Sequence, residues 1–158
     1  MAAPSPERAG APAAPAGYAP GSYPEPLSHG ERVRLAVEIL AAYAQAKRAL
    51  RRAPIEAAVA TLRSQSPPPP AEDGTGSLEH ARRLGWAVTR LLSHVPGDTR
   101  CLARSLVLTR LLAARGIEAK LVIGARTEPE FLAHAWVEHA GSAVLDPGDG
   151  SFGRLVEL

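Results

Sequence analysis

The sequence predicts an α+β fold, in which helices come first and one helix followed by a small antiparallel sheet comes last. Apolar residues recur at helical spacing through much of residues 28–115. Short runs typical of strands follow at 119–124, 133–138 and 143–146. The hydrophobic residues make up 46% of the chain, which is enough to form a core.

The prolines divide the 158 residues into parts, and this length suits one domain. Residues 1–27 are rich in Pro, Ala and Gly and show no sustained amphipathic period, so we expect a disordered tail. Residues 28–66 are expected to form an N-terminal helical region. A proline-rich linker or loop is expected at 67–76, and the core that carries the sheet at 77–158.

Three helices are expected before the last part of the chain. Ser28, with Glu31 three residues later, matches a capping box at the start of the first helix. Pro54 suits the first turn of the second helix. The third helix is expected to run from Ser77 to about Ser93.

The fourth helix and the sheet have their own signals. This helix is expected from Cys101 to Arg115, with Asp98 or Thr99 as its cap and Gly116 as its stop. A turn at residues 140–142 would join the last two runs as a hairpin. The final segment, 152–158, is expected to add an edge strand.

Composition and motifs exclude several classes of function. Eighteen Lys and Arg against 16 Asp and Glu leave a net charge of +2, which does not argue for nucleic acid. Cys101 is the only cysteine, so an intramolecular disulfide and a cysteine-rich zinc site are both excluded. No apolar stretch approaches the roughly 18 residues that span a bilayer, and no signal peptide is present, so a soluble cytoplasmic protein is expected. The chain has no GxxxxGK[ST] or GxGxxG motif, and we expect no cofactor.

Cys101 has two interpretations. It shares a helix face with Ser105, Leu108 and Leu112, and a free cysteine on an apolar face is often a small buried hydrophobe. It also lies in the first turn of its helix, where unpaired N–H groups and the helix dipole favour a thiolate. The same N–H groups could hold an oxyanion, which makes Cys101 a candidate nucleophile.

His134 and Asp146 could complete a thiol triad with Cys101. In a strand, His134 shares a face with Trp136 and Glu138, while Asp146 ends the next strand. The hairpin would place the two side by side, so that the carboxylate could fix the imidazole tautomer. Each residue also has an ordinary structural interpretation, because a strand histidine is usually satisfied locally and an Asp before Pro is usually a turn residue.

Other assignments of these groups remain open. Cys101, His134 and Asp146 could instead ligate zinc, although the chain has no HExxH or CxxC motif. His94 is a poorer second candidate base, and His139 lies on the opposite face of its strand. The two remaining histidines, His29 and His80, are expected on the surface.

Three sequence blocks resemble one known family. Residues 100–117 (RCLARSLVLTRLLAARGI) resemble the cysteine motif of the lasso-peptide leader peptidases of the microcin-processing type. LVIG at 121–124 with AHAWVE at 133–138 is similar to the histidine block of that family, and LDP at 145–147 stands where the family has its aspartate. The resemblance covers about residues 77–158 and implies a transglutaminase-like, papain-like cysteine protease core.

The resemblance also implies roles and partners. Cys101 would be the nucleophile, His134 the general base and Asp146 the residue that orients it. The activity would be removal of the leader from a ribosomally made lasso-peptide precursor, which is then the substrate. Residues 1–27 are too short and too rich in proline to form the recognition domain that some members carry, so a separate leader-recognition protein is expected as a partner. The ATP-dependent, macrolactam-forming lasso cyclase is a further candidate partner, and neither nucleic acid nor a membrane is expected.

An alternative from another class is a catalytically inert transglutaminase-like scaffold that binds a precursor or a partner protein. A complete candidate triad favours the enzyme. Within the enzyme class, acyl transfer and deamidation on the same fold stay open.

Overall fold

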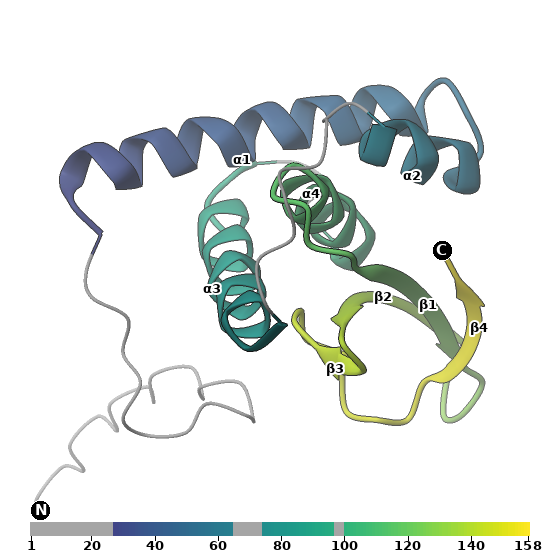
Figure 1. Cartoon of the computed structure of the whole chain (residues 1–158). Coiled ribbons are helices and arrows are strands. Elements are labelled where there is room, and N and C mark those ends of the chain that lie inside the picture. Colours follow the sequence, from purple (N-terminus) through teal and green to yellow (C-terminus); the bar gives the residue numbers. More distant parts are fainter. Residues whose placement is uncertain (1–26, 65–73, 97–99) are drawn as a thin grey trace, which may run out of the picture.

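The predicted order of helices and strands is the order in the structure. The computed structural model describes residues 27–64, 74–96 and 100–158 (Figure 1). Its elements are α1 (His29–Leu50), α2 (Ile55–Ser64), α3 (Gly74–Leu92), α4 (Cys101–Ala113), β1 (Lys120–Arg126), β2 (Leu132–His139), β3 (Ser142–Ala143) and β4 (Gly153–Glu157). The predicted α+β class is therefore confirmed. Residues 1–26 of the expected tail and 67–73 of the expected linker lie outside the described residues.

The helix ends follow the local signals with three differences, the first being that α4 ends at Ala113, two residues before the expected Arg115. The capping box is present, since Ser28 Oγ accepts from the Glu31 N–H at 3.3 Å and Glu31 Oε2 accepts from the Ser28 N–H at 2.8 Å. Gly116 follows α4 with φ 69°, the left-handed conformation that glycine allows at a helix stop. The third helix begins at Gly74, three residues before the expected start. Arg100 is the N-cap residue of α4, whereas the expected caps, Asp98 and Thr99, lie outside the described residues.

α4 lies at the centre of the core. The other three helices pack against it, and the sheet packs on it through β2 and β1 (Figure 1). Its leucines at 106, 108, 111 and 112 are almost completely buried. The core cluster combines side chains of α1 and α2 with side chains of α3, α4 and the sheet, so the N-terminal helices share one core with the rest.

The sheet is antiparallel, in the order β3-β2-β1-β4. Leu121 pairs with Val137 in the β1–β2 register, and both belong to the core cluster that the helices cover. Trp136, one residue away, points to the other face. Its ring covers Gly124 so closely that a Cβ there would lie 2.9 Å from two ring carbons. The sheet therefore has a helix-covered face and a second face that carries Trp136.

The hairpin between β2 and β3 turns as expected but its second strand is shorter. Ala140 and Gly141 both have positive φ, 49° and 74°, as a tight hairpin turn requires. Only Ser142–Ala143 forms β3, where the sequence predicted a run to 146. The ladder stops because the N–H groups of residues 144 and 145 both donate to the Val137 carbonyl, at 2.9 and 3.3 Å.

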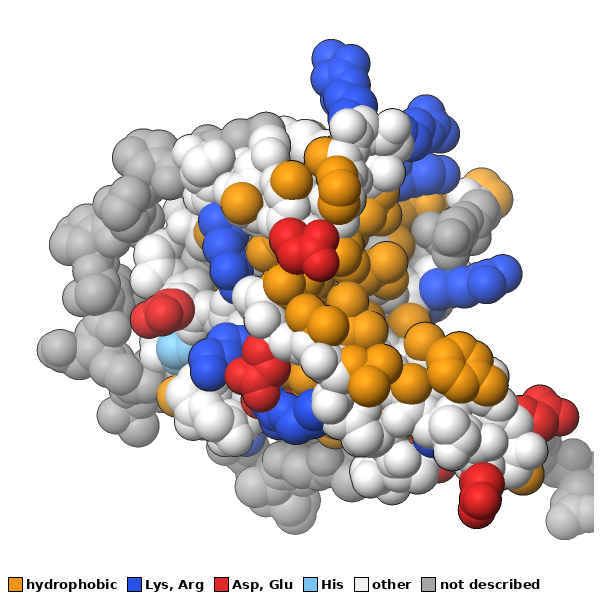
Figure 2. Space-filling model, turned by 90° about the vertical axis from the view of Figure 1, so that its right-hand side faces the viewer, with side chains coloured by type: hydrophobic (Ala, Val, Ile, Leu, Met, Phe, Trp, Pro, Cys, Tyr) orange, Lys and Arg blue, Asp and Glu red, His pale blue; other side chains and the backbone are white. Residues whose placement is uncertain are grey.

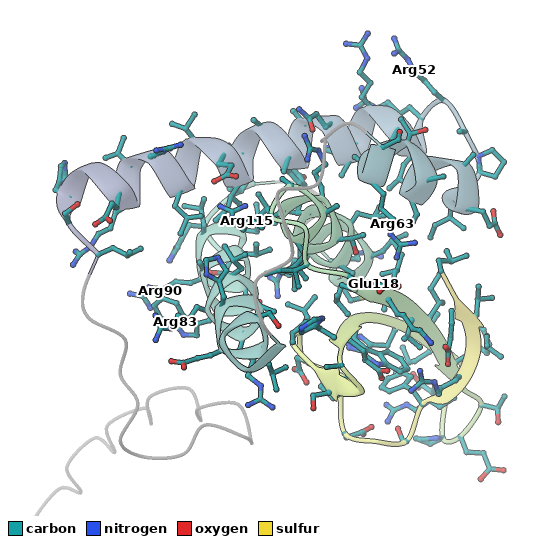
Figure 3. All side chains as sticks on the ribbon, in the orientation of Figure 1. Arg52, Arg63, Arg83, Arg90, Arg115 and Glu118 are labelled. Carbon is teal, nitrogen blue, oxygen red and sulfur yellow. The ribbon has the colours of Figure 1, made fainter. Side chains whose placement is uncertain are left out.

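Two arginines tie the helices to the rest of the fold (Figure 3). Arg115, after α4, makes a two-pronged ion pair with Glu38 of α1, with N–O distances of 2.9 and 2.8 Å. Arg63 of α2 donates to the carbonyls of Ala119 and Leu158, at 2.6 and 2.9 Å. Burial lowers the pKa of Arg63 while the charge of Glu118 opposes this shift, and the guanidinium anchors α2 to the start of β1 and the end of the chain.

Replacing Arg63 with methionine is expected to lower the free energy of unfolding by about 1–3 kcal/mol. The substitution keeps an apolar stem but removes the Arg63 donor from the Ala119 carbonyl and leaves the Leu158 oxygen with the Leu121 N–H. Urea unfolding followed by circular dichroism would measure the change. Arg34→Met is the matched control, since Arg34 is exposed, and its effect should stay within about 0.5 kcal/mol. Equal losses in the two variants would contradict the anchoring role.

The surface has an apolar side at the edge of the sheet. Figure 2 turns the β4 side of Figure 1 toward the viewer and shows hydrophobic side chains gathered there. Every residue of β4 is exposed, Leu155 and Val156 included. Within the described residues, no helix has the length and apolar character needed to cross a membrane.

Candidate active site

Cys101 is the first residue of α4 and is half-buried. Its helix face is the apolar one that the sequence predicted, since Ser105, Leu108 and Leu112 are fully buried one, two and three turns along. Ser105 Oγ donates to the Ala135 carbonyl of β2 at 3.0 Å. This hydrogen bond fixes the position of α4 on the sheet one turn from the thiol.

The start of α4 is favourable for negative charge. The N-cap residue, Arg100, makes no side-chain hydrogen bond to the first turn, and that turn contains no acidic residue. The N–H groups of a first helical turn have no partner within the helix, and the dipole of a helix places partial positive charge there. An oxyanion held beside Cys101 would be stabilised by this arrangement.

His134 lies on β2 and is held by the segment that follows β3. Its Nε2 is 2.9 Å from the carbonyl oxygen of Asp146. Its ring stacks on Trp136 at a centroid distance of 6.1 Å and contacts Phe152 at 5.1 Å. A carbonyl oxygen can only accept, so Nε2 carries a proton and Nδ1 of the neutral ring is the nitrogen able to take one.

Asp146 reaches His134 with a different atom from the one expected. The sequence predicted a contact through the carboxylate, but the main-chain carbonyl makes it. The carboxylate Oδ1 instead accepts from the Gly148 N–H at 2.9 Å and closes a turn. Gly148 has φ 81°, and a Cβ there would lie 2.8 Å from the Phe152 ring, so this turn requires glycine. The carboxylate thus shapes the loop whose backbone holds the imidazole.

Cys101 and His134 line one cavity of about 410 Å³. Its apolar wall is formed by Leu50, Leu102, Ala103, Ile123, Ala133 and Ala135, and its polar wall adds Lys47, Arg51 and Arg100. Among the described residues, no hydrogen bond joins Cys101 to His134. The His134 ring stacks on Trp136, whereas α4 packs on the face that carries Ala135.

The other histidines have different surroundings. His139 is on the helix-covered face, where Nδ1 meets the Glu118 carbonyl at 2.5 Å and Nε2 meets Ser77 Oγ at 2.8 Å. His94, His29 and His80 are exposed, as expected for the last two. In the three segments that the structure describes, no three His, Cys, Asp or Glu side chains gather as the ligands of a metal ion would.

Sequence reasoning missed two residues of the cavity wall. Lys47 of α1 and Arg51, the C-cap of α1, come 54 and 50 residues before Cys101 in the chain, and they line the cavity with it. Their spacing of one helical turn was visible in the sequence. The same spacing is typical of a solvated helix face, so it does not by itself indicate a site.

Comparison with known proteins decides the family. The family described as the transglutaminase-like superfamily matches residues 33–157, which is most of the chain and includes almost all of the helices and strands that the structure describes. This chain belongs to the transglutaminase-like superfamily. The predicted transglutaminase-like core is thereby confirmed, and the match extends further toward the N-terminus than the three sequence blocks did.

Part of this transglutaminase-like chain is also similar to a protein of Escherichia coli. The microcin J25-processing protein McjB of Escherichia coli is 50% identical over 46 residues, which make up 29% of this chain and 22% of that protein. The similarity therefore spans less than a quarter of the relative. No solved structure matches the chain significantly.

Glu138, on the same sheet face as Trp136, makes the stability of this transglutaminase-like fold depend on pH. Burial is the largest influence and raises the pKa of Glu138, but hydrogen bonds from Trp136 and Arg154 and the charge of Arg154 together hold it below its ordinary value of 4.5. A lowered carboxylate pKa contributes stability that is present above the unfolded pKa and is lost as the pH falls through the folded pKa.

We therefore expect the free energy of unfolding to fall as the pH drops below about 4.5. Glu138→Gln should be less stable than the wild type near neutral pH and should lose less stability on acidification. Urea unfolding at a series of pH values would show this difference. The control, Glu56→Gln, replaces an exposed carboxylate on α2 and should follow the wild type. A Glu138→Gln curve parallel to that of the wild type would contradict the expectation.

Proposed function

We propose that this chain is a cysteine peptidase that removes the leader peptide from a ribosomally made lasso-peptide precursor. The observation that carries the proposal is that Cys101, at the start of α4, and His134, held by Asp146, line one cavity. The partial similarity to a microcin J25-processing protein supports a peptide precursor as the substrate.

The chemistry follows from the atoms that the site presents. His134 Nδ1 takes the proton of the Cys101 thiol, and the thiolate attacks the scissile carbonyl. The N–H groups of the first turn of α4 hold the oxyanion. His134 then protonates the leaving amine, and water releases the leader as a free acid. In this proposal, the His134 ring leaves its stacked position on Trp136 when the peptide binds and turns toward Cys101, with which it lines the cavity.

Asp146 is proposed as a positioning residue for His134. Asp146→Asn keeps the main-chain carbonyl and supplies an amide oxygen that can accept from the Gly148 N–H, so cleavage should fall less than about tenfold. Asp146→Ala loses the turn and should lower kcat by about 100-fold or more, with a smaller change in KM. Equal kcat values in the two variants would contradict this role.

The proposed partners are a separate leader-recognition protein and the ATP-dependent lasso cyclase. The test combines the purified full-length chain with lasso precursors, that of microcin J25 included, each with its own recognition protein. Mass spectrometry should find a leader that ends in a free carboxyl group and a core with a free amine. A leader that carries an added amine would indicate acyl transfer instead. A precursor that is bound but stays intact in every mixture would support the inert scaffold.

A further inference from the structure

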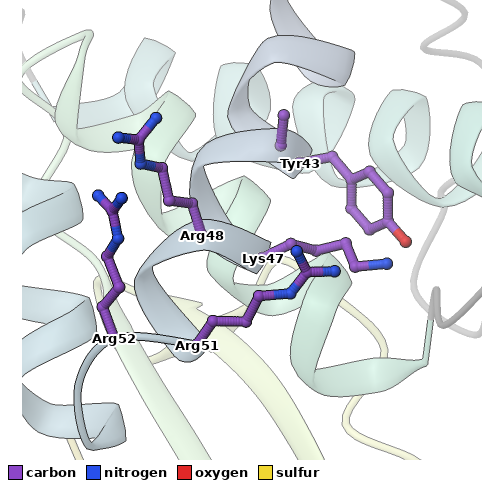
Figure 4. Close-up of a pocket in the computed structure, with 6 residues that line it drawn as sticks. Tyr43, Lys47, Arg48, Arg51 and Arg52 are labelled. Carbon is purple, nitrogen blue, oxygen red and sulfur yellow. The ribbon is translucent and has the colours of Figure 1, made fainter.

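A second cavity lies along the C-terminal half of α1. Its volume is about 580 Å³, and it is lined by Tyr43, Ala44, Lys47, Arg48, Arg51 and Arg52 (Figure 4). Four of these six residues are cations. Lys47, Arg48, Arg51 and Arg52 are named the cation groove here.

The charges of the cation groove are not balanced by the described part of the protein. None of the four cations forms an ion pair with a described residue, and no Asp or Glu lines this cavity or the cavity of Cys101. Arg115 and Arg154 show the opposite pattern, since each is paired with a glutamate. The groove therefore presents positive charge that an anionic ligand could neutralise.

The spacing of the cations makes the unbalanced positive charge of the cation groove less favourable. Lys47 and Arg48 lie in the last turn of α1, Arg51 is its C-cap and Arg52 follows it. Lys47 and Arg51 are four residues apart, as are Arg48 and Arg52, and like charges at this spacing repel each other along a helix. The dipole at the end of α1 favours cations and offsets part of the repulsion. Figure 4 shows Lys47 and Arg51 extending in the same direction beside Tyr43, and the ammonium of Lys47 lies 5.4 Å from the centre of the Tyr43 ring. A bound carboxylate would remove the repulsion that remains.

The cation groove is continuous with the cavity of the candidate nucleophile. Lys47 and Arg51 line both cavities. On the other side of these two residues the wall becomes apolar, with Leu50, Leu102 and Ile123 near Cys101. A peptide with one residue in the apolar cavity would thus place neighbouring residues beside the cations.

We propose that the cation groove binds an acidic segment of the peptide substrate close to the bond that is cut. This inference rests on the proposed peptidase function and adds the substrate class, a peptide with Asp or Glu residues near the cleavage site. A peptide fits better than a nucleic acid because the groove leads into an apolar cavity. Tyr43, the one aromatic residue in the lining, is buried and carries Lys47 over its ring, so it is not available as a platform for stacked bases.

The test measures binding and does not depend on cleavage. The full-length chain with Cys101→Ala is titrated into a short fluorescein-labelled peptide that carries several Glu residues, and into a matched peptide with Gln at those positions. Fluorescence anisotropy should show the Glu peptide binding about tenfold more tightly at low salt. Raising the salt concentration should remove most of this preference, because exposed charges are screened.

Matched charge variants locate the site. Adding Lys47→Gln and Arg51→Gln should reduce the preference for the Glu peptide to less than about twofold. The control pair, Arg34→Gln and Arg82→Gln, removes the same charge from exposed positions that line neither cavity, and it should keep the preference. Thermal unfolding of both double variants checks that the fold is intact.

The outcomes separate this inference from the function on which it rests. Equal binding of the Glu and Gln peptides, or equal losses in the groove and control variants, would overturn the cation groove as an acidic-peptide site. A labelled single-stranded oligonucleotide that binds at the groove more tightly than the Glu peptide would also overturn it. Leader cleavage without any Glu preference would refute the groove alone, whereas Glu preference without cleavage of any precursor would refute the peptidase alone.

Discussion

Cys101→Ala is expected to lower the rate of leader release by at least about a thousandfold, to the limit of detection. Cys101 is the only cysteine of the chain, so no second thiol can replace it. The loss should appear in kcat, because the covalent step itself is removed and the cavity keeps its shape. The residue is half-buried at a helix start, so the free energy of unfolding should change by less than about 1 kcal/mol.

The measurement is mass spectrometry of the precursor, the leader and the core over time. Iodoacetamide provides an independent measurement, because it should add one label to the wild type and none to Cys101→Ala. Labelled wild type should no longer cleave the precursor. Cys101→Ser serves as the conservative variant and should also be inactive, because a serine hydroxyl is a far weaker nucleophile without a matched base. Undiminished cleavage by Cys101→Ala would remove Cys101 as the nucleophile.

Gly85→Ala is expected to destabilise the fold by about 2–4 kcal/mol, the largest effect among the substitutions on the scaffold. A Cβ at Gly85 would lie 2.0 Å from the carbonyl oxygen of Val144 and 3.4 Å from a methyl carbon of Leu108. The Val144 carbonyl belongs to the backbone and cannot rotate away as a flexible side chain could. α3 would therefore have to move away from the segment after β3. That segment leads to Asp146, so cleavage should fall along with stability.

Gly30→Ala is the matched control, because it makes the same change in another helix. Nothing lies within 4 Å of a Cβ at Gly30, and alanine is the better helix former by about 1 kcal/mol. Gly30→Ala should therefore unfold at equal or higher urea concentration than the wild type, while Gly85→Ala unfolds at a clearly lower one. The close approach of α3 to Val144 would be refuted if both variants shifted the midpoint in the same direction.

The fold could be predicted from the sequence where the signals are local. The capping box at Ser28 and the stop at Gly116 depend only on residues nearby in the chain, and both are present. The early end of β3 could not be predicted, because it depends on two N–H groups that share the carbonyl of Val137 on another strand. Likewise, the amphipathic pattern of α1 and α2 indicated helices but did not show that both would cover α4.

Some features of the candidate site could also be predicted from the sequence, and others could not. The hairpin made it possible to predict that His134 and Asp146 would be neighbours. Which atom of Asp146 faces the imidazole depends on the turn at Gly148, and that turn is set by the fit of a loop against Phe152. Lys47 and Arg51 line the cavity because α1 packs on α4. This contact between two helices cannot be predicted from the spacing of residues within either one.

The packing of α1 and α2 on α4 limits how the chain can be shortened or combined with parts of other proteins. A fragment that begins at residue 77 would keep Cys101, His134 and Asp146, yet it would lose Ile39, Ala46 and Leu62 from the core. The leucines of α4 would then meet water, and such a fragment would aggregate before it could act. Residues 77–158, which carry the candidate site, therefore cannot be moved alone into a chimera, and α1 and α2 must be included with them.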